Sequence, residues 1–92
     1  FIALPGGCGT FEELFEAITW KRLGLHTKPI LLVNVNGFFD PCVELLERSI
    51  SECFMDQRHR NMWSVVVSVE DIVQALYNAP PWDESARRFA AI

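Results

Sequence analysis

The stretch that decides the fold is Pro5-Gly6-Gly7-Cys8-Gly9-Thr10-Phe11-Glu12-Glu13. The apolar run at residues 1–4 leads into it, and an amphipathic helical pattern leads out of it. A strand, a glycine-rich turn and a helix N-terminus in this order form a site for anions. The glycines let the backbone approach a phosphate closely, and the first amides of the helix direct partial positive charge at it. The stretch therefore predicts a phosphate-binding loop.

Glu13 adds a carboxylate in the first turn of the expected helix, beside the predicted phosphate position. A phosphate cradle needs no acid so close, so this residue indicates chemistry on a phosphorylated ligand. The same spacing has a structural interpretation, because Thr10-x-x-Glu13 matches a capping box. In that motif the Thr10 hydroxyl accepts from the Glu13 amide, and the Glu13 carboxylate accepts from the Thr10 amide. The pattern by itself leaves both interpretations open.

The loop fits neither G-x-G-x-x-G nor G-x-x-x-x-G-K-[ST], the two standard nucleotide-binding loops. It resembles the P-G-G-x-G-T-x-x-E signature of the Lonely Guy family, which are cytokinin-activating phosphoribohydrolases also called lysine decarboxylase-like. The matching positions are Pro5, Gly6, Gly7, Gly9, Thr10 and Glu13. The similarity covers residues 1–78, and its other matches are Thr19-Trp20, Leu23-Gly24, His26, Lys28-Pro29, Asn34, Gly37-Phe38-Phe39 and Phe54.

The resemblance implies an N-glycosidic hydrolase of cytokinin biosynthesis. Its substrate would be an N6-substituted adenosine 5′-monophosphate, and its products the free base and ribose 5-phosphate. The resemblance gives Glu13 the catalytic role and gives phosphate binding to Gly6, Gly7, Gly9 and Thr10. Glu12 and Asn34 are further candidates for ligand contact. The family's site also uses an arginine and a second glycine-rich segment that belong upstream, and no residue here matches them.

Other functions remain open on the sequence. One is a non-catalytic nucleotide-binding module or a degenerate fragment of the same fold. Another is a general nucleotide 5′-monophosphate nucleosidase. The resemblance implies a homodimer or higher homo-oligomer when the protein is full length. It implies neither a metal nor another cofactor.

Apolar runs alternate with amphipathic stretches along the chain, which predicts an α/β fold with a Rossmann-like parallel sheet and flanking helices. The expected strands are residues 1–4, 30–33 and 64–67, and the expected helices are residues 10–24, 40–54 and 68–78. Residues 1–4 read as a buried strand with nothing before it. We therefore expect an incomplete sheet: the C-terminal half of a domain over residues 1–78, followed by a loosely ordered tail at residues 79–92.

Three local features refine these helices. Phe11, Leu14, Phe15 and Ile18 follow the spacing of a buried helix face. Gly24 is placed to end the first helix in a left-handed conformation. Cys53 stands where the Lonely Guy family commonly has glycine. If that position is left-handed, the cysteine costs on the order of 1 kcal/mol.

Composition bounds the class of protein. The chain has 92 residues, a hydrophobic fraction of 50% and a net charge of −4, which together exclude a disordered chain and argue against nucleic-acid or anionic-membrane partners. No apolar run has the roughly 20 residues of a membrane helix, and no signal peptide is visible. The three cysteines lack paired spacing, so we expect reduced thiols in the cytoplasm and no metal site.

Overall fold

Three parallel strands alternate with helices, as the sequence predicts. The computed structural model describes residues 1–90. Its main elements are β1 (Ile2–Ala3), α1 (Cys8–Arg22), β2 (Leu31–Val33), α2 (Asp40–Ser51), β3 (Ser64–Val66) and α3 (Ile72–Asn78). Short 3-10 helices lie at η1 (Val35–Gly37), η2 (Gln57–Met62), η3 (Val69–Asp71) and η4 (Ala86–Phe89). Among these residues, no helix is both long and apolar enough to cross a membrane.

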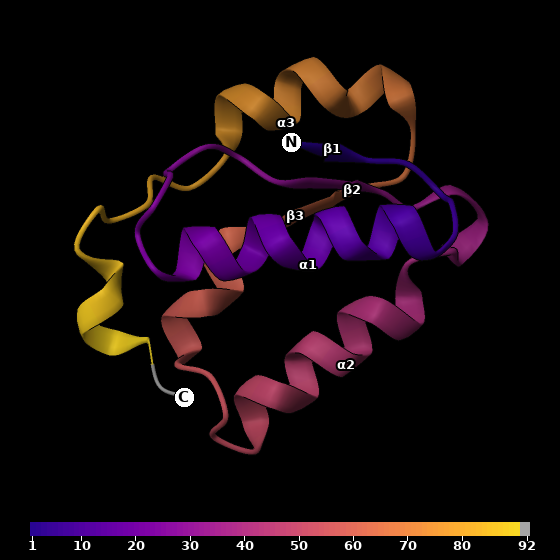
Figure 1. The fold of residues 1–92 in the computed structure, drawn as a ribbon. Helices are drawn as coiled ribbons and strands as arrows, with labels where there is room; N and C mark the ends of the chain where they lie inside the picture. Colours follow the sequence, from indigo (N-terminus) through magenta and orange to yellow (C-terminus); the bar gives the residue numbers. More distant parts are fainter. Residues whose placement is uncertain (91–92) are drawn as a thin grey trace.

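The sheet has the order β1-β2-β3, with Ile2 opposite Leu31 and Leu31 opposite Ser64. Helices α1 and α2 lie on one side of it and α3 lies on the other (Figure 1). The central strand is consequently covered on both faces, and residues 30–33 are at most 1% exposed. This burial explains why that run is uniformly apolar. The predicted α/β class with a small parallel sheet is confirmed.

Helix α1 begins earlier than predicted. Its first residue is Cys8, its N-cap is Gly7, and the Phe11 amide donates to the Gly7 carbonyl at 3.1 Å. Thr10 is therefore inside the helix, and the helix has no side-chain cap. The capping-box interpretation of Thr10 and Glu13 is wrong, as is the placement of Glu13 in the first turn. Glu13 is the sixth helical residue and lies in the second turn.

The buried face of α1 also differs from the prediction. Leu14 and Ile18 are buried as expected, but Phe11 and Phe15 are each 37% exposed. The residue that completes the buried face is Lys21, which is 1% exposed. Leu14, Ile18 and Lys21 are spaced as regularly along a helix face as the residues of the predicted stripe. Packing of α1 against η2 and the tail decides which of the two faces is buried.

Both long helices end in the same backbone motif. After α1 the Gly24 amide donates to Lys21 O and the Leu25 amide to Trp20 O, both at 2.9 Å. After α2 the corresponding donors are Cys53 and Phe54, to Ile50 O and Ser49 O. This Schellman pattern requires a left-handed residue, and Gly24 has φ of 77° while Cys53 has φ of 67°. The expected stop at Gly24 and the suspected left-handed cysteine are both confirmed.

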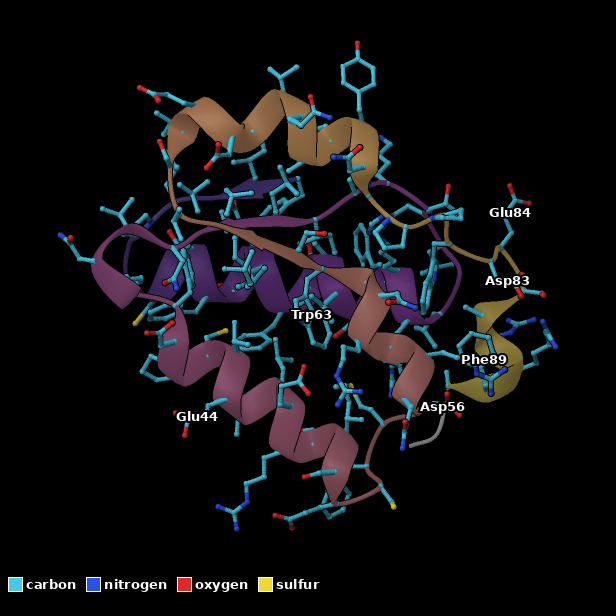
Figure 2. The ribbon with its side chains drawn as sticks, turned by 180° about the vertical axis from the view of Figure 1, so that it is seen from behind. Glu44, Asp56, Trp63, Asp83, Glu84 and Phe89 are labelled. Atoms are coloured by element: carbon cyan, nitrogen blue, oxygen red, sulfur yellow. The ribbon has the colours of Figure 1, made fainter. Side chains whose placement is uncertain are left out.

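Residues 79–90 are packed on the body of the protein, so the expectation of a loosely ordered tail is wrong for them. The Trp82 indole donates to the Lys21 carbonyl at 2.7 Å, and Ala86 is fully buried. Phe89 lies beside the start of η2, near Asp56 (Figure 2). Proline and charge in this segment suggested a free end, but its tryptophan and phenylalanine gain burial by docking. Residues 91–92 lie outside the described part of the chain.

The left-handed Cys53 generates a stability prediction. Cys53→Gly removes the steric cost of a β-carbon at positive φ, and part of that gain is offset because glycine has more freedom in the unfolded chain. We expect the free energy of unfolding to rise by roughly 0.5–1 kcal/mol, measured by urea denaturation. Cys53→Ala keeps the β-carbon and serves as the control. Equal stabilisation by alanine would show that the backbone conformation is not the cause.

Candidate functional site

The glycine loop lies where strand β1 ends and helix α1 begins. Gly7 is the N-cap and has no side chain, so the amides of the first helical turn have no side-chain acceptor. The first amides of any helix also lack intrahelical partners, and they carry the positive end of the helix dipole. The loop therefore presents unpaired N–H donors at the carboxyl edge of the sheet, where ligands of α/β proteins bind.

The glycines of this loop have different roles. A β-carbon at Gly6 would lie 2.3 Å from the Thr10 Oγ1 atom, so a larger residue at this position would displace the Thr10 side chain. A β-carbon at Gly7 or Gly9 would meet nothing within 4 Å. Gly6 thus shapes the loop, whereas Gly7 and Gly9 keep open the space through which a ligand can reach the backbone.

Glu13 lies on the same face of α1 as Gly9 and Thr10, which belong to the first helical turn. Residues three and four apart are neighbours on a helix surface, so Glu13 follows Thr10 and Gly9 by one turn, roughly 6 Å along the axis. Its side chain is exposed, and Glu12 is exposed on a different flank, about 100° around the helix. A ligand whose phosphate binds the first turn would therefore place its next group beside Glu13.

A groove of about 610 Å³ runs on from Glu13 along α1. Its lining residues are Phe1, Glu13, Glu16, Ala17, Trp20, Leu25, His26 and Lys28. None of the loop glycines lines this groove. Glu13 therefore lies between the glycine loop and the groove, and the loop and Glu13 do not share one closed cavity. Glu16 and Trp20 were not predicted as site residues. Their spacing of three and seven from Glu13 is the signal that could have found them.

Asn34 is used inside the chain. It follows β2 at the carboxyl edge, and its Oδ1 accepts from the Phe39 amide at 2.6 Å. Its Nδ2 donates to the Asp40 carboxylate at 2.7 Å. These bonds hold the η1 turn and the first residue of α2, so a ligand would have to compete with them.

Two aromatic rings border the loop. Phe11 of α1 and Phe38, just after η1, are stacked with centroids 6.3 Å apart and planes 10° apart, and both rings are partly exposed. They form a flat apolar surface at the carboxyl edge. This contact could not be predicted from local sequence spacing, because Phe11 lies between β1 and β2 whereas Phe38 lies between β2 and β3.

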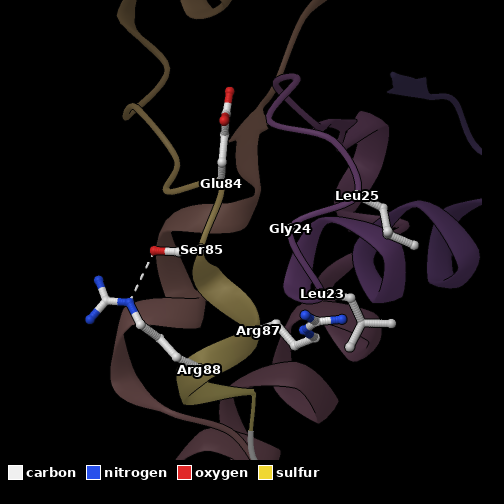
Figure 3. A pocket seen from close by; sticks show the side chains of 7 residues that line it. All are labelled: Leu23, Gly24, Leu25, Glu84, Ser85, Arg87 and Arg88. Atoms are coloured by element: carbon white, nitrogen blue, oxygen red, sulfur yellow. Dashed lines mark hydrogen bonds between the residues drawn. The ribbon is translucent and has the colours of Figure 1, made fainter.

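A second pocket, of about 530 Å³, lies at the opposite end of α1 (Figure 3). It is lined by Leu23, Gly24, Leu25, Glu84, Ser85, Arg87 and Arg88. The Arg88 Nε atom donates to Ser85 Oγ at 3.0 Å, and the same guanidinium pairs with Asp83. Because α1 has 15 residues, it separates this pocket from the glycine loop by roughly 20 Å. Among residues 1–90, no group of three or more potential ligand side chains could hold a metal ion.

The chain is similar to a protein-family model and to several curated proteins. A family model described as "Possible lysine decarboxylase" matches residues 1–76. The cytokinin riboside 5′-monophosphate phosphoribohydrolase LOG2 of Arabidopsis thaliana is 47% identical over 76 residues, which are 83% of this chain and 34% of that protein. The phosphoribohydrolase LOG of Oryza sativa subsp. japonica is 41% identical over 91 residues, covering 91% of this chain and 38% of that protein.

The chain thus spans well under half the length of these curated relatives. The family model nevertheless matches most of the chain, including the whole glycine loop, α1 and the three strands of the sheet. The chain therefore belongs to the family described as possible lysine decarboxylases, the family of the Lonely Guy phosphoribohydrolases, as the loop sequence predicted.

Proposed function

We propose that this chain is part of an enzyme that hydrolyses the N-glycosidic bond of cytokinin riboside 5′-monophosphates. The main support for this proposal is the arrangement on α1. Its N-terminus has unpaired amides, and the Glu13 carboxylate lies one turn further along the same helix face. This order matches a ligand in which a phosphate is joined to a ribose. The names of the relatives support the substrate class.

In the proposed reaction the loop binds the 5′-phosphate through the amides of Gly7, Gly9 and Thr10, while Gly6 shapes the turn. Cleavage of a glycosidic bond passes through an oxocarbenium-like state with positive charge at the anomeric carbon. Glu13 stabilises that charge and activates the attacking water. A second group must help the base to leave, and we assign it to the part of the relatives' length that this chain does not span. Residues 1–78 then form the carboxyl-terminal part of a larger Rossmann-like domain.

The role of Glu13 is tested in the full-length gene product. Glu13→Gln keeps the shape of the side chain and removes its charge, so we expect kcat for base release to fall at least about 100-fold. Glu84→Gln, an exposed glutamate in the pocket at the opposite end of α1, is the matched control and keeps kcat within about twofold of the parent. Parental base release by a folded Glu13→Gln protein would eliminate this role and favour a nucleotide-binding module without catalysis.

Phosphate binding is tested separately. Gly7→Ala places a methyl group in open space beside the first amides, so the fold is retained while the ligand is kept away. We expect the dissociation constant for an N6-alkyl adenosine 5′-monophosphate to rise about tenfold or more, by isothermal titration calorimetry, with an unchanged melting temperature. Cys8→Ala, one residue further on, is the control and binds normally. Unchanged affinity of Gly7→Ala would exclude the loop as the phosphate site.

We also propose that the full-length protein is a homo-oligomer that pairs through the outer faces of α1 and α2. Phe15, Leu45 and Phe54 line one groove of about 340 Å³ on this surface, and each is at least 37% exposed. Exposed apolar clusters of this kind are typical of subunit contacts. Leu45→Ser with Phe54→Ser should lower the mass measured by light scattering to that of a single subunit. An unchanged mass would place the contact elsewhere.

A cytoplasmic location is the last element of the proposal. Cys8, Cys42 and Cys53 are all free thiols. Unpaired cysteines are usual in reducing compartments. Fractionation of the source cells checks this assignment, and recovery of the protein in a secreted fraction would overturn it.

A further inference from the structure

His59 is a buried histidine that the proposed reaction does not use. Its ring is fully buried in η2. The Nδ1 atom accepts a hydrogen bond from the Asp56 amide at 2.9 Å, so the ring proton of the neutral form lies on Nε2. Nε2 has no hydrogen-bond partner in the described part of the chain. A buried polar atom without a partner is costly and calls for an explanation.

The ring is covered by the end of the chain, residues 79–90, which we call the strap. The centroid of the His59 ring lies 6.1 Å from that of the Trp82 ring and 5.4 Å from that of the Phe89 ring. Trp82 is tied to α1 by its hydrogen bond to Lys21 O. Phe89 is covered on another side by the Arg58 guanidinium, 3.8 Å from the ring centroid. The strap therefore docks by placing two aromatic side chains against His59.

Among residues 1–90, the carboxylates that act on His59 are already paired with arginines, so none of them is free to hold a protonated ring. At the N-cap of η2, the Asp56 carboxylate already accepts three bonds from Arg58, from its amide at 2.9 Å and from its guanidinium at 2.8 and 3.0 Å. On α1, the positive charge of Arg22 acts on His59, and the buried Lys21 ammonium donates to Met62 O nearby. On the strap, Asp83 is paired with Arg88. An imidazolium here would be repelled by Arg22 and Arg58, and the Asp56 charge would offset this only in part.

We propose that His59 is a proton-sensitive latch whose protonation releases the strap from α1 and η2. A proton added at Nδ1 would point at the Asp56 N–H, so an acceptor would become a second donor at 2.9 Å. The capping interaction at the start of η2 would be lost. The charged ring would have to reach solvent, and Trp82 and Phe89 block its path while the strap is docked.

The direction of the pH effect follows from the burial. Desolvation, together with Arg22 and Arg58, lowers the pKa of His59 from its ordinary value of 6.5, and the Asp56 charge opposes this only in part. The docked form thus binds the proton less readily than the released form, so docking is favoured above pH 6.5 and weakens as the pH falls. The docking equilibrium constant should fall by up to about tenfold for each pH unit below 6.5.

Hydrogen exchange of the full-length gene product between pH 7.5 and 5 tests the latch, after correction for intrinsic exchange rates. We expect the amides of residues 83–90 and the Trp82 indole to lose protection on acidification, while residues 31–33 of β2 keep theirs. His59→Asn retains an acceptor in the place of Nδ1 but does not titrate, and His59→Phe retains a ring. The strap should stay protected at low pH in both variants.

His26 supplies the matched control, because its Nδ1 also accepts a backbone amide, that of Lys28. His26→Asn should lose strap protection on acidification as the parent chain does. The proposal is overturned if the parent strap is equally protected at both pH values, if β2 opens together with the strap, or if the His59 variants respond to acid as the parent does. If neither His59 variant folds, the test uses the parent chain alone. The pH midpoint at which its strap loses protection must then equal the pH midpoint of His59 protonation measured by NMR, and different midpoints would overturn the proposal.

Discussion

Every layer of this structure packs against one strand, β2. It pairs with β1 on one side and β3 on the other, so its backbone is satisfied within the sheet. Helices α1 and α2 lie on one side of it, where their buried residues share a core cluster with Ile30 and Leu32, and α3 covers the other side (Figure 1). Residues 30–33 carry no polar side chain and are almost wholly buried, because a strand covered on both faces can only hold apolar residues. The carboxyl edge that positions the glycine loop exists only because this strand holds its neighbours in register.

The weakest part of the core lies on the opposite side of α1, where two polar side chains are buried. Lys21 donates to Met62 O, and burial lowers the pKa of its ammonium to about 8. His59 has one ring nitrogen unpartnered. Both groups cost free energy in an apolar environment. The strap, residues 79–90, covers these groups: Trp82 lies against both His59 and Lys21, and Phe89 lies against His59.

Much of the fold and part of the site could be predicted from the sequence. The strand, loop and helix around Gly7 are local, because residues close in the chain create them. The same holds for the turns at Gly24 and Cys53, whose conformations follow from hydrogen bonds within one helix end. Two expectations failed for a shared reason. Both were valid local patterns that the rest of the structure did not use. The capping box at Thr10 is absent because α1 begins at Cys8, and the stripe through Phe15 is not buried because Lys21 is buried instead.

The α/β class, the family and the glycine loop with a carboxylate close behind it follow from the sequence alone. These depend on residue order and on short-range geometry. Only the tertiary structure decided which face of α1 is buried, that Asn34 is committed to Asp40, and that the strap encloses His59. Those contacts join residues from separate elements, up to 61 positions apart in the bond between Trp82 and Lys21. No local spacing encodes them, because they form only after the layers have packed.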